Sequence, residues 1–264
     1  MTELAAITLE RHAKKVYQNA PDNAFAAERT VIPLVGAELR KAALTMPTGF
    51  TKLDAGYQLV AITSLQPGKN LYVAPDGKWL GGYIPAALRA YPFQLAQHEG
   101  AGEFILCINE ASGLVVENTE DGNAFFDDQD QPTQGIKDIL NFLTQIKASR
   151  NGTEGAVNAL ADAGLITPWE INRKQGEKVV PVEGLYSVDE SALNKLDDED
   201  FLAVSKAGGL ALAYAQLLSM NQLVVLERLG NLQGQFLEQQ AANSEAANLT
   251  GFSLSEDEGS LMFE

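Results

Sequence analysis

The chain has 264 residues, of which 45% are hydrophobic and 20% charged, enough to bury a core in one large domain or two small ones. Its 19 basic residues against 35 acidic ones give a net charge of -16 at pH 7. This charge repels phosphate backbones and anionic lipid surfaces, so we expect no nucleic-acid partner. The acidity is uneven, because no Lys or Arg follows Arg228.

The N-terminus and the single cysteine bear on the cellular compartment. Charged residues arrive at Glu10, Arg11 and Lys14, where a secretory signal would need an apolar stretch. Cys107, within FILCI, has no partner for an internal disulfide, which agrees with a reducing compartment. No uninterrupted apolar run reaches the roughly 20 residues that cross a bilayer. We therefore expect a cytoplasmic protein without a membrane span.

The first half is predicted to be mixed, with strands dominant. Apolar positions in residues 3–18 are compatible with a helix that ends before Pro21, and residues 37–44 contain strong helix formers. Strand-forming residues and turns at 66–68 and 76–77 predict a mostly antiparallel sheet. The predicted strands are residues 31–34, 58–65, 71–73 and 104–108.

After Pro132 the pattern becomes helical. Apolar residues at three- and four-residue spacing predict an amphipathic helix, which Asn151-Gly152 is expected to end. Thr153 is the expected N-cap of a second helix, and Gly164 stands where a left-handed residue would follow that helix. The apolar residues of the first helix are Ile136, Ile139, Leu140, Leu143 and Ile146.

A β-hairpin is predicted next, from residues 165–172 and 179–188, with Gly176 in its loop. Ser187 or Asp189 is the expected cap of the turn that follows.

A long helical stretch is predicted from residue 201 to about 232. The four acids at 197–200 precede it, where negative charge favours the positive end of a helix dipole. Residues 233–247 are expected to prolong this helix as a fraying end, and residues 249–264 to form a flexible acidic arm.

The sequence contains no convincing catalytic, metal or cofactor constellation. His12, His98 and Cys107 are too few for the usual zinc sites, and the nucleophile-elbow pattern GxSxG is absent. The phosphate-binding patterns GxxxxGK[ST] and GxGxxG are absent as well. The acidic loop at 127–130 lacks the glycine and glutamate positions of an EF-hand, so a solvated turn is expected there. We therefore predict no catalytic residue, no metal and no cofactor.

Residues 70–93, NLYVAPDGKWLGGYIPAALRAYPF, form the most distinctive stretch. Asp76-Gly77 is a tight-turn dipeptide, and Pro85 and Pro92 fix φ at the two ends of a short helical segment. Aromatic rings, hydroxyls and a guanidinium are typical of recognition surfaces, and aromatic rings are also typical of a sheet's inner face. Both interpretations stay open. The candidate ligand-binding residues are His12, Trp79, Tyr83, Arg89 and Tyr91, and Phe93 belongs to the same cluster.

Three blocks, in the same order, resemble the bacterial SapC-like proteins, a family named for a component associated with surface layers. The blocks are ERHAKKVY, the stretch at 70–93, and GLYSVDESALNKLDDEDFLAVSKAGGLALAYAQLLSMNQLVVLERL, and they span about residues 9–232. The resemblance implies a link, through the family name, to surface-layer or secretion pathways, and it assigns no chemical role to any residue. The residues that match the blocks are Arg11, His12, Asn70, Asp76, Gly77, Trp79, Tyr83, Pro85, Arg89, Tyr91, Pro92, Phe93, Asp189, Glu190, Leu193 and Leu196.

Together these features predict an α+β protein in which a β-rich antiparallel N-terminal half packs with a helical C-terminal half. The SapC-like domain is expected at 1–232, β-rich at about 25–130 and mostly helical at about 133–232, with a fraying helix and disordered acidic tail at 233–264. The expected function is non-enzymatic: an accessory or binding protein that recognises a peptide, a small molecule or a protein partner through the surface at 79–93.

Two further functions stay open. An enzyme, or the obligate partner of one, would use His12 with Asp189 or Glu190 as an acid–base pair that only the fold brings together. Alternatively, the acidic tail would dock into a basic, apolar groove of a partner protein. The candidate docking residues are Phe252, Leu254, Leu261, Met262 and Phe263.

Overall fold

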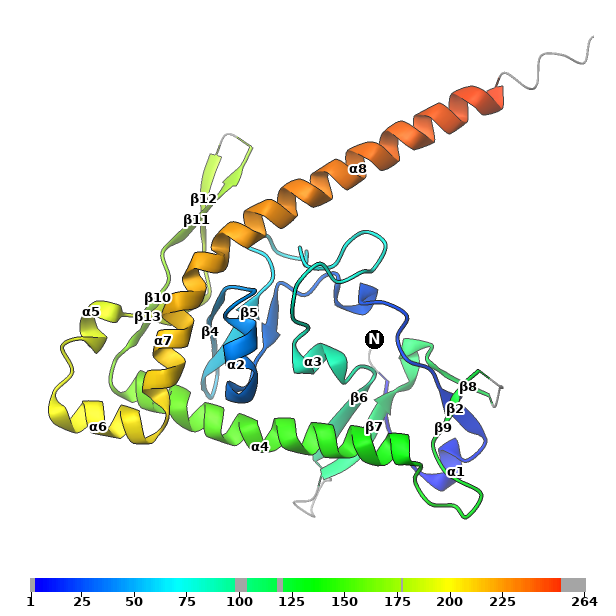
Figure 1. Cartoon of the computed structure of the whole chain (residues 1–264), viewed down its shortest axis with the longest axis horizontal. Helices are drawn as coiled ribbons and strands as arrows, with labels where there is room; N and C mark the ends of the chain where they lie inside the picture. The colour runs from blue at the N-terminus through cyan, green and yellow to red at the C-terminus, as the bar shows by residue number, and fades with distance from the viewer. Residues whose placement is uncertain (1–2, 98–103, 118–120, 177, 253–264) are drawn as a thin grey trace, which may run out of the picture.

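The computed structural model of the chain describes residues 3–97, 104–117, 121–176 and 178–252. Its architecture confirms the α+β class, with antiparallel sheets, a β-rich first half and a helical second half (Figure 1). The strands are β1 Leu4–Ala6, β2 Lys15–Tyr17, β3 Val31–Pro33, β4 Thr48–Leu53, β5 Gly56–Ile62, β6 Phe93–Gln97, β7 Phe104–Asn109, β8 Val115–Glu117, β9 Asn123–Ala124, β10 Ile166–Pro168, β11 Ile171–Gln175, β12 Lys178–Val182 and β13 Leu185–Val188. The helices are α1 Leu9–His12, α2 Gly36–Ala42, α3 Ala86–Arg89, α4 Gln134–Asp162, α5 Glu190–Leu193, α6 Asp198–Lys206, α7 Gly209–Ser219 and α8 Leu223–Phe252, with short 3-10 helices η1 Ala24–Ala26, η2 Glu110–Ser112 and η3 Met220–Gln222.

The largest sheet has the antiparallel strand order β10-β13-β4-β5-β3. Strands β4 and β5 form a hairpin that closes at the pair Leu53 and Gly56, and Gly56 supplies a φ of +130° that other residues rarely adopt. Strand β4 is missing from the strands that the sequence predicts. The predicted hairpin at 165–188 is present, and its base strands β10 and β13 join this sheet. The two halves of the chain therefore share one sheet.

The main hydrophobic core lies between this sheet and the helices α4 and α7. Phe50 and Leu59 of the sheet, Leu160 of α4 and Ala213 of α7 are fully or almost fully buried in it. Burying each of the large side chains stabilises the fold by roughly 1.5–3 kcal/mol.

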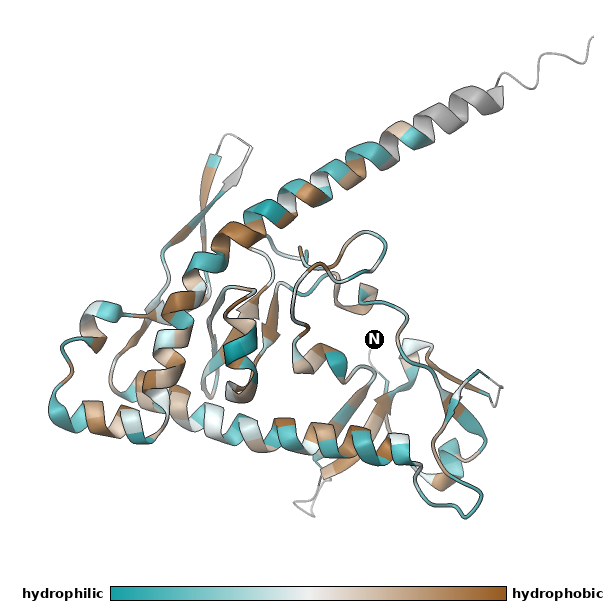
Figure 2. Cartoon of the chain, in the orientation of Figure 1, coloured by the Kyte–Doolittle hydropathy of each residue, from teal (hydrophilic) through white to brown (hydrophobic). Residues whose placement is uncertain are grey.

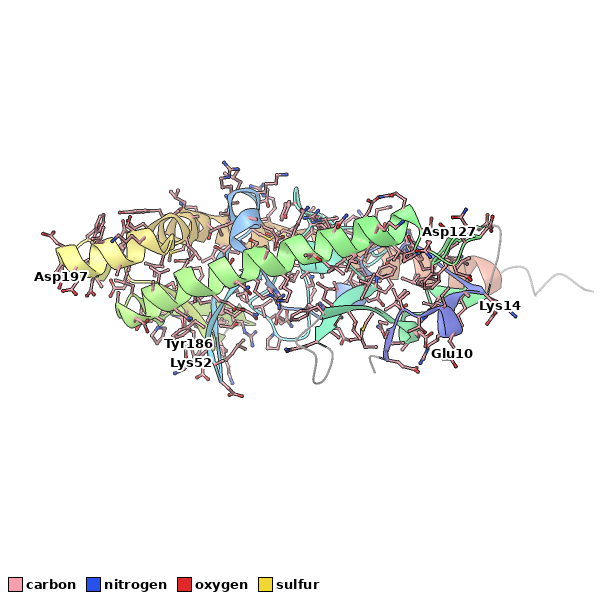
Figure 3. The ribbon with its side chains drawn as sticks, turned by 90° about the horizontal axis from the view of Figure 1, so that it is seen from below. Glu10, Lys14, Lys52, Asp127, Tyr186 and Asp197 are labelled. Atoms are coloured by element: carbon pink, nitrogen blue, oxygen red, sulfur yellow. The ribbon has the colours of Figure 1, made fainter. Side chains whose placement is uncertain are left out.

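A second, smaller core lies at the other end of the molecule. It is enclosed by the sheets β1-β7-β6 and β8-β2-β9 and by the first turns of α4. Tyr17 contacts Phe93 edge-on there, with ring centroids 5.0 Å apart, and Ile136 of α4 packs against the same cluster. Helix α4 thus joins the two cores, and Figure 3 shows it crossing the length of the body.

The predicted end of the helix at Asn151-Gly152 is wrong, because α4 continues through both residues. Glycine inside a helix costs about 1 kcal/mol relative to alanine, but the turns that follow bury Val157 and Leu160 in the main core. Thr153, the expected N-cap, lies inside the helix, where its hydroxyl donates to the carbonyl of Ser149 at 2.7 Å. Tertiary packing therefore overrides the local stop signal.

The N-terminal residues 3–18 do not form the expected helix. They form β1, the single turn α1, and β2. Strand β1 pairs with β7, so that Ala5 lies opposite Ile108, and β2 pairs with β8 and β9. These partners lie about a hundred positions later in the chain, so the local apolar pattern carries no signal of them.

The long helix predicted after residue 201 is divided into α6, α7 and α8. Gly208, with φ of +80°, separates α6 from α7, and η3 separates α7 from α8. The predicted capping is confirmed, because the Asp197 carboxylate accepts a hydrogen bond from Asp200 N at 2.9 Å. Asp189 caps α5 in the same way, and Gly164 has the expected positive φ of +67°.

Helix α8 leaves the body of the molecule and projects as an arm (Figure 1). The stretch Gly209–Gln239 is long and apolar enough to cross a membrane by length and composition, and 33% of its most apolar 18-residue window is buried. Figure 2 shows apolar residues along its first turns. A core helix meets the same criteria, and α7 packs on β4 and β13. The expected absence of a membrane span stays a prediction.

The helix that the sequence predicts to continue past residue 232 is present, because α8 ends at Phe252. The other candidate docking residues, Leu254, Leu261, Met262 and Phe263, lie outside the described residues.

Candidate functional site

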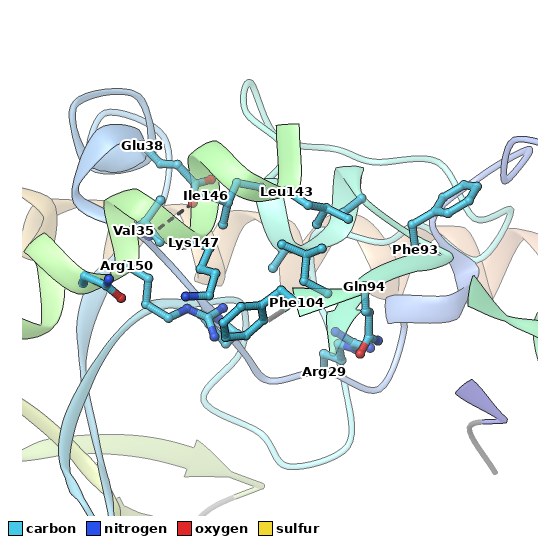
Figure 4. A pocket seen from close by; sticks show the side chains of 15 residues that line it. Arg29, Val35, Glu38, Phe93, Gln94, Phe104, Leu143, Ile146, Lys147 and Arg150 are labelled. Atoms are coloured by element: carbon cyan, nitrogen blue, oxygen red, sulfur yellow. Dashed lines mark hydrogen bonds between the residues drawn. The ribbon is translucent and has the colours of Figure 1, made fainter. Parts of the chain in front are cut away.

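A cleft opens where α4 passes between the outer strands of two sheets. Strand β3 is the last strand of the five-stranded sheet, and β6 is the last strand of the sheet β1-β7-β6. Side chains from both strands, from α2 and α3, and from the middle of α4 enclose a volume of about 490 Å³ (Figure 4). The cleft thus lies at the junction of the two hydrophobic cores.

The floor of the cleft is apolar, with one carboxylate. Val35, Ala90 and Phe93 are buried, and α4 adds two side chains that the amphipathic pattern places on its inner face. The floor residues are Val35, Glu38, Ala90, Phe93, Leu143 and Ile146.

Glu38 is buried in the floor, and its carboxylate is satisfied by protein donors. Oε2 accepts a hydrogen bond from Val35 N at 3.2 Å. Oε1 accepts one from the Tyr83 hydroxyl at 2.8 Å and one from Ala86 N at 2.5 Å. Burial, followed by this contact with Glu38, raises the pKa of Tyr83 to about 12. Glu38 therefore connects α2 to α3. Its carboxylate already accepts hydrogen bonds from the protein and does not require a cationic group of a ligand as a partner.

The rim of the cleft is basic. Arg29 and Arg150 are exposed, and Lys147 places Nζ 3.7 Å from the centroid of the Phe104 ring. Within the part of the chain that the structure describes, none of these three cations forms an ion pair with a carboxylate. Figure 4 shows Lys147 and Arg150 close to Phe104, with Arg29 set apart from them near Gln94 in this view. In a chain of net charge -16, this is a local positive patch.

The predicted aromatic cluster stands behind the cleft. Trp79 stacks on Tyr72 with ring centroids 5.3 Å apart, and its Nε1 donates to the carbonyl of Tyr83 at 2.9 Å. Tyr91 stacks on Phe25 at 3.8 Å. None of Trp79, Tyr83 and Tyr91 lines the cleft. The Tyr83 hydroxyl contacts Glu38, which lines the cleft, whereas Trp79 and Tyr91 stack on residues that do not line it.

Arg89, the basic member of the cluster, is held by neighbouring groups. Its Nε donates to the carbonyl of Ile84 at 3.1 Å, and Nη2 donates to the Tyr83 hydroxyl at 3.3 Å. The guanidinium also lies 4.9 Å from the centroid of the Phe142 ring. Arg89 thus packs α3 against α4, whereas Phe93, from the same block, lines the cleft at the start of β6 and directs its ring into the second core against Tyr17.

His12 is completely buried beside Phe125 and lies apart from the cleft. Its Nδ1 accepts a hydrogen bond from Thr8 N at 3.3 Å. Its Nε2 lies 3.4 Å from a carboxylate oxygen of Glu110 and forms no hydrogen bond to any described residue. Hydrogen bonds from Arg11 and then from Lys15 lower the pKa of Glu110 to about 2.

The acid–base pair of His12 with Asp189 or Glu190 is not formed. Helices α1 and α5 lie at opposite ends of the molecule (Figure 1), and Asp189 is engaged as the N-cap of α5. The described part of the chain therefore offers no geometric support for the enzymatic alternative based on that pair.

Because the imidazole of His12 is buried, we expect the stability of the protein to depend on pH. Burial lowers the pKa of His12, so the unfolded chain, with a histidine pKa of about 6.5, binds a proton at higher pH than the folded protein. The folded state should therefore lose stability as the pH falls below about 6.5. We expect His12→Asn, which keeps an acceptor for Thr8 N, to flatten the decline between about pH 7.5 and 5.5 in urea unfolding.

The wild-type chain, unfolded under the same conditions, gives the reference slope for this titration. A His12→Asn protein with the same slope as the wild type would contradict the assignment.

Comparison with known families completes the description of the site. Residues 7–226 match the family model SapC. The chain belongs to the SapC family. Searches among curated proteins and among solved structures found no match.

The match extends from the segment before α1 into the start of α8, so the whole cleft of this SapC protein lies within the family region. The rim is the part of the site that the sequence predictions do not include. Its one local signal is the spacing of Lys147 and Arg150, three residues apart on α4 and beside the apolar face that includes Ile146. Arg29 joins them only through the fold.

Proposed function

We propose that this SapC protein is a non-enzymatic binding protein that holds a peptide or small molecule in the cleft between β3, β6 and α4. The observation that carries the proposal is the combination of an apolar floor with three basic rim residues that have no acidic partner among the described residues. A concave, mostly apolar site of about 490 Å³ with a few polar groups is typical of small-ligand sites.

The proposed cellular role is that of a cytoplasmic accessory protein in a cell-surface or secretion pathway. The buried, unpaired thiol of Cys107 is compatible with a reducing compartment. The pathway itself rests on the family name. The residues at 79–93 support the binding role indirectly, since α3 and Phe93 help to form the cleft.

Filling the cleft tests the proposal. The neutral dye Nile red should bind the wild-type chain with a saturable rise in fluorescence, because the floor offers it an apolar surface out of water. Ile146→Trp adds bulk to the floor from the surface of α4 and should abolish the saturable component.

The matched control is Leu140→Trp, on the same helix at a position that is 38% exposed and does not line the cleft. This variant should bind the dye as the wild type does, and it also accounts for dye that binds the apolar arm of α8. Equal saturable binding by the Ile146→Trp and Leu140→Trp proteins would contradict the cleft as the binding site.

A further inference from the structure

We propose that the ligand of the cleft is an amphiphile with an anionic head, whose apolar part lies on the floor and whose carboxylate or phosphate contacts Arg29, Lys147 and Arg150. The inference rests on the proposed binding function and names the class of ligand. It comes from the way in which charge and apolar surface are divided between the rim and the floor.

The rim residues supply the attraction for an anion. Arg29 and Arg150 present guanidinium groups to solvent, and Lys147 is held over the Phe104 ring rather than beside a described carboxylate. Arginine forms bidentate hydrogen bonds with carboxylates and phosphates, so two arginines and a lysine among the residues that line the cleft match such a head group. In a chain of net charge -16, these cations, which have no carboxylate partner among the described residues, form a local site of attraction for an anion.

The floor fixes the orientation of the ligand. Val35 and Ala90 are buried and apolar, and Leu143 and Ile146 of α4 add partly exposed apolar side chains, so the floor favours a hydrocarbon group over a charged one. The carboxylate of Glu38, with its oxygens already bonded to Val35 N, Ala86 N and the Tyr83 hydroxyl, would repel a second anion at that depth. An anionic head therefore has its favourable position at the rim, with the tail directed inward.

The size of the cleft limits the ligand to a small molecule or to a chain end. About 490 Å³ lies within the range of roughly 300–1,000 Å³ that holds drug-sized ligands. A head at the rim keeps part of its water, so the charges need not be fully desolvated. Single-chain amphiphiles are the simplest molecules with this division of polarity.

Calorimetry on the full chain with four probes that carry a chain of about twelve carbons tests the inference. The charged probes are used below their critical micelle concentrations and dodecanol below its solubility limit. Dodecanoate and dodecyl phosphate should bind, and dodecanol should bind at least about tenfold more weakly, because a charge-assisted hydrogen bond is worth more than a neutral one. Dodecyltrimethylammonium should bind most weakly. The ratio of the two anions distinguishes a carboxylate ligand from a phosphate ligand.

Charge removal at the rim provides the matched comparison. The double variant Arg29→Gln and Arg150→Gln should lose at least about tenfold in affinity for both anions and keep its affinity for dodecanol. The control double variant, Arg40→Gln and Arg228→Gln, changes the net charge equally at exposed positions outside the cleft and should bind like the wild type.

The outcomes separate this inference from the function on which it rests. Equal affinity for dodecanoate, dodecanol and the ammonium probe would overturn the anionic head while leaving an apolar ligand site in place. An equal loss of anion affinity in both double variants would also overturn it, because the effect would then be that of net charge alone. Failure of every probe and of Nile red to bind would overturn both proposals.

Discussion

Replacing Gln216 by leucine is expected to lower the free energy of unfolding by about 2–3 kcal/mol, because the buried Val188 N loses its partner and the buried Thr48 carbonyl keeps only a long contact, 3.5 Å, with the Ser219 hydroxyl. Gln216 is completely buried on α7. Its Oε1 accepts a hydrogen bond from Val188 N at 3.0 Å, and its Nε2 donates to the carbonyl of Thr48 at 3.1 Å. Strands β13 and β4 pair Leu185 with Thr51, and the same register would place Val188 opposite Thr48. The side-chain amide thus replaces the backbone pairing where the two strands separate.

Chemical denaturation and thermal melting of the Gln216→Leu protein measure this cost. For a chain of this length, 1 kcal/mol corresponds to about 2–4 °C in Tm, so the loss should be readily resolved. Gln235→Leu, the same substitution at an exposed position of α8, is the control and should change stability by less than about 0.5 kcal/mol. A Gln216→Leu protein as stable as the control would show that water or a shift of the strands satisfies both backbone groups.

The features of the fold that the sequence predicts correctly depend on neighbours along the chain. Carboxylate caps at Asp189 and Asp197 and the left-handed Gly164 act within one helical turn. The features that it misses depend on distant partners. Strand β1 is fixed by pairing with β7, and the stop signal at Gly152 is overridden by the packing of α4 against the sheet and α7. Local propensity is a weak prior where such packing competes with it.

The same difference between local and long-range contacts explains which parts of the site the sequence predicts. The residues at 79–93 have the composition of a recognition surface, and most of their polar groups are used inside the protein. The Tyr83 hydroxyl donates a hydrogen bond to Glu38, which lies 45 positions earlier, and no local sequence pattern predicts that contact. Arg29, Lys147 and Arg150 line the same cleft, although more than a hundred positions of the chain separate Arg29 from the other two. The composition of residues 79–93 thus points to a segment next to the cleft. The position of the opening and its basic residues can be seen only in the tertiary structure.

Replacing Glu38 by glutamine is expected to destabilise the protein by about 2 kcal/mol, because three donors converge on its two carboxylate oxygens. A glutamine has one acceptor oxygen, and its amide nitrogen would face either Val35 N or the donors from Tyr83 and Ala86. One donor-to-donor contact would therefore remain in the buried floor of the cleft, and the hydrogen bonds that the charged carboxylate accepts would be replaced by weaker ones to a neutral amide. The loss should appear in urea unfolding at neutral pH.

A second measurement distinguishes this mechanism from a general loss of packing. Removing the carboxylate removes one of the causes that raise the pKa of Tyr83, so the Tyr83 phenol should ionise at lower pH in the Glu38→Gln protein, as observed by NMR of the labelled ring. Glu227→Gln, an exposed change on α8 with the same change of charge, should leave both stability and the Tyr83 titration unchanged. A destabilised Glu38→Gln protein with an unchanged Tyr83 titration would contradict the hydrogen-bonded role of this carboxylate, because packing alone would then account for the loss.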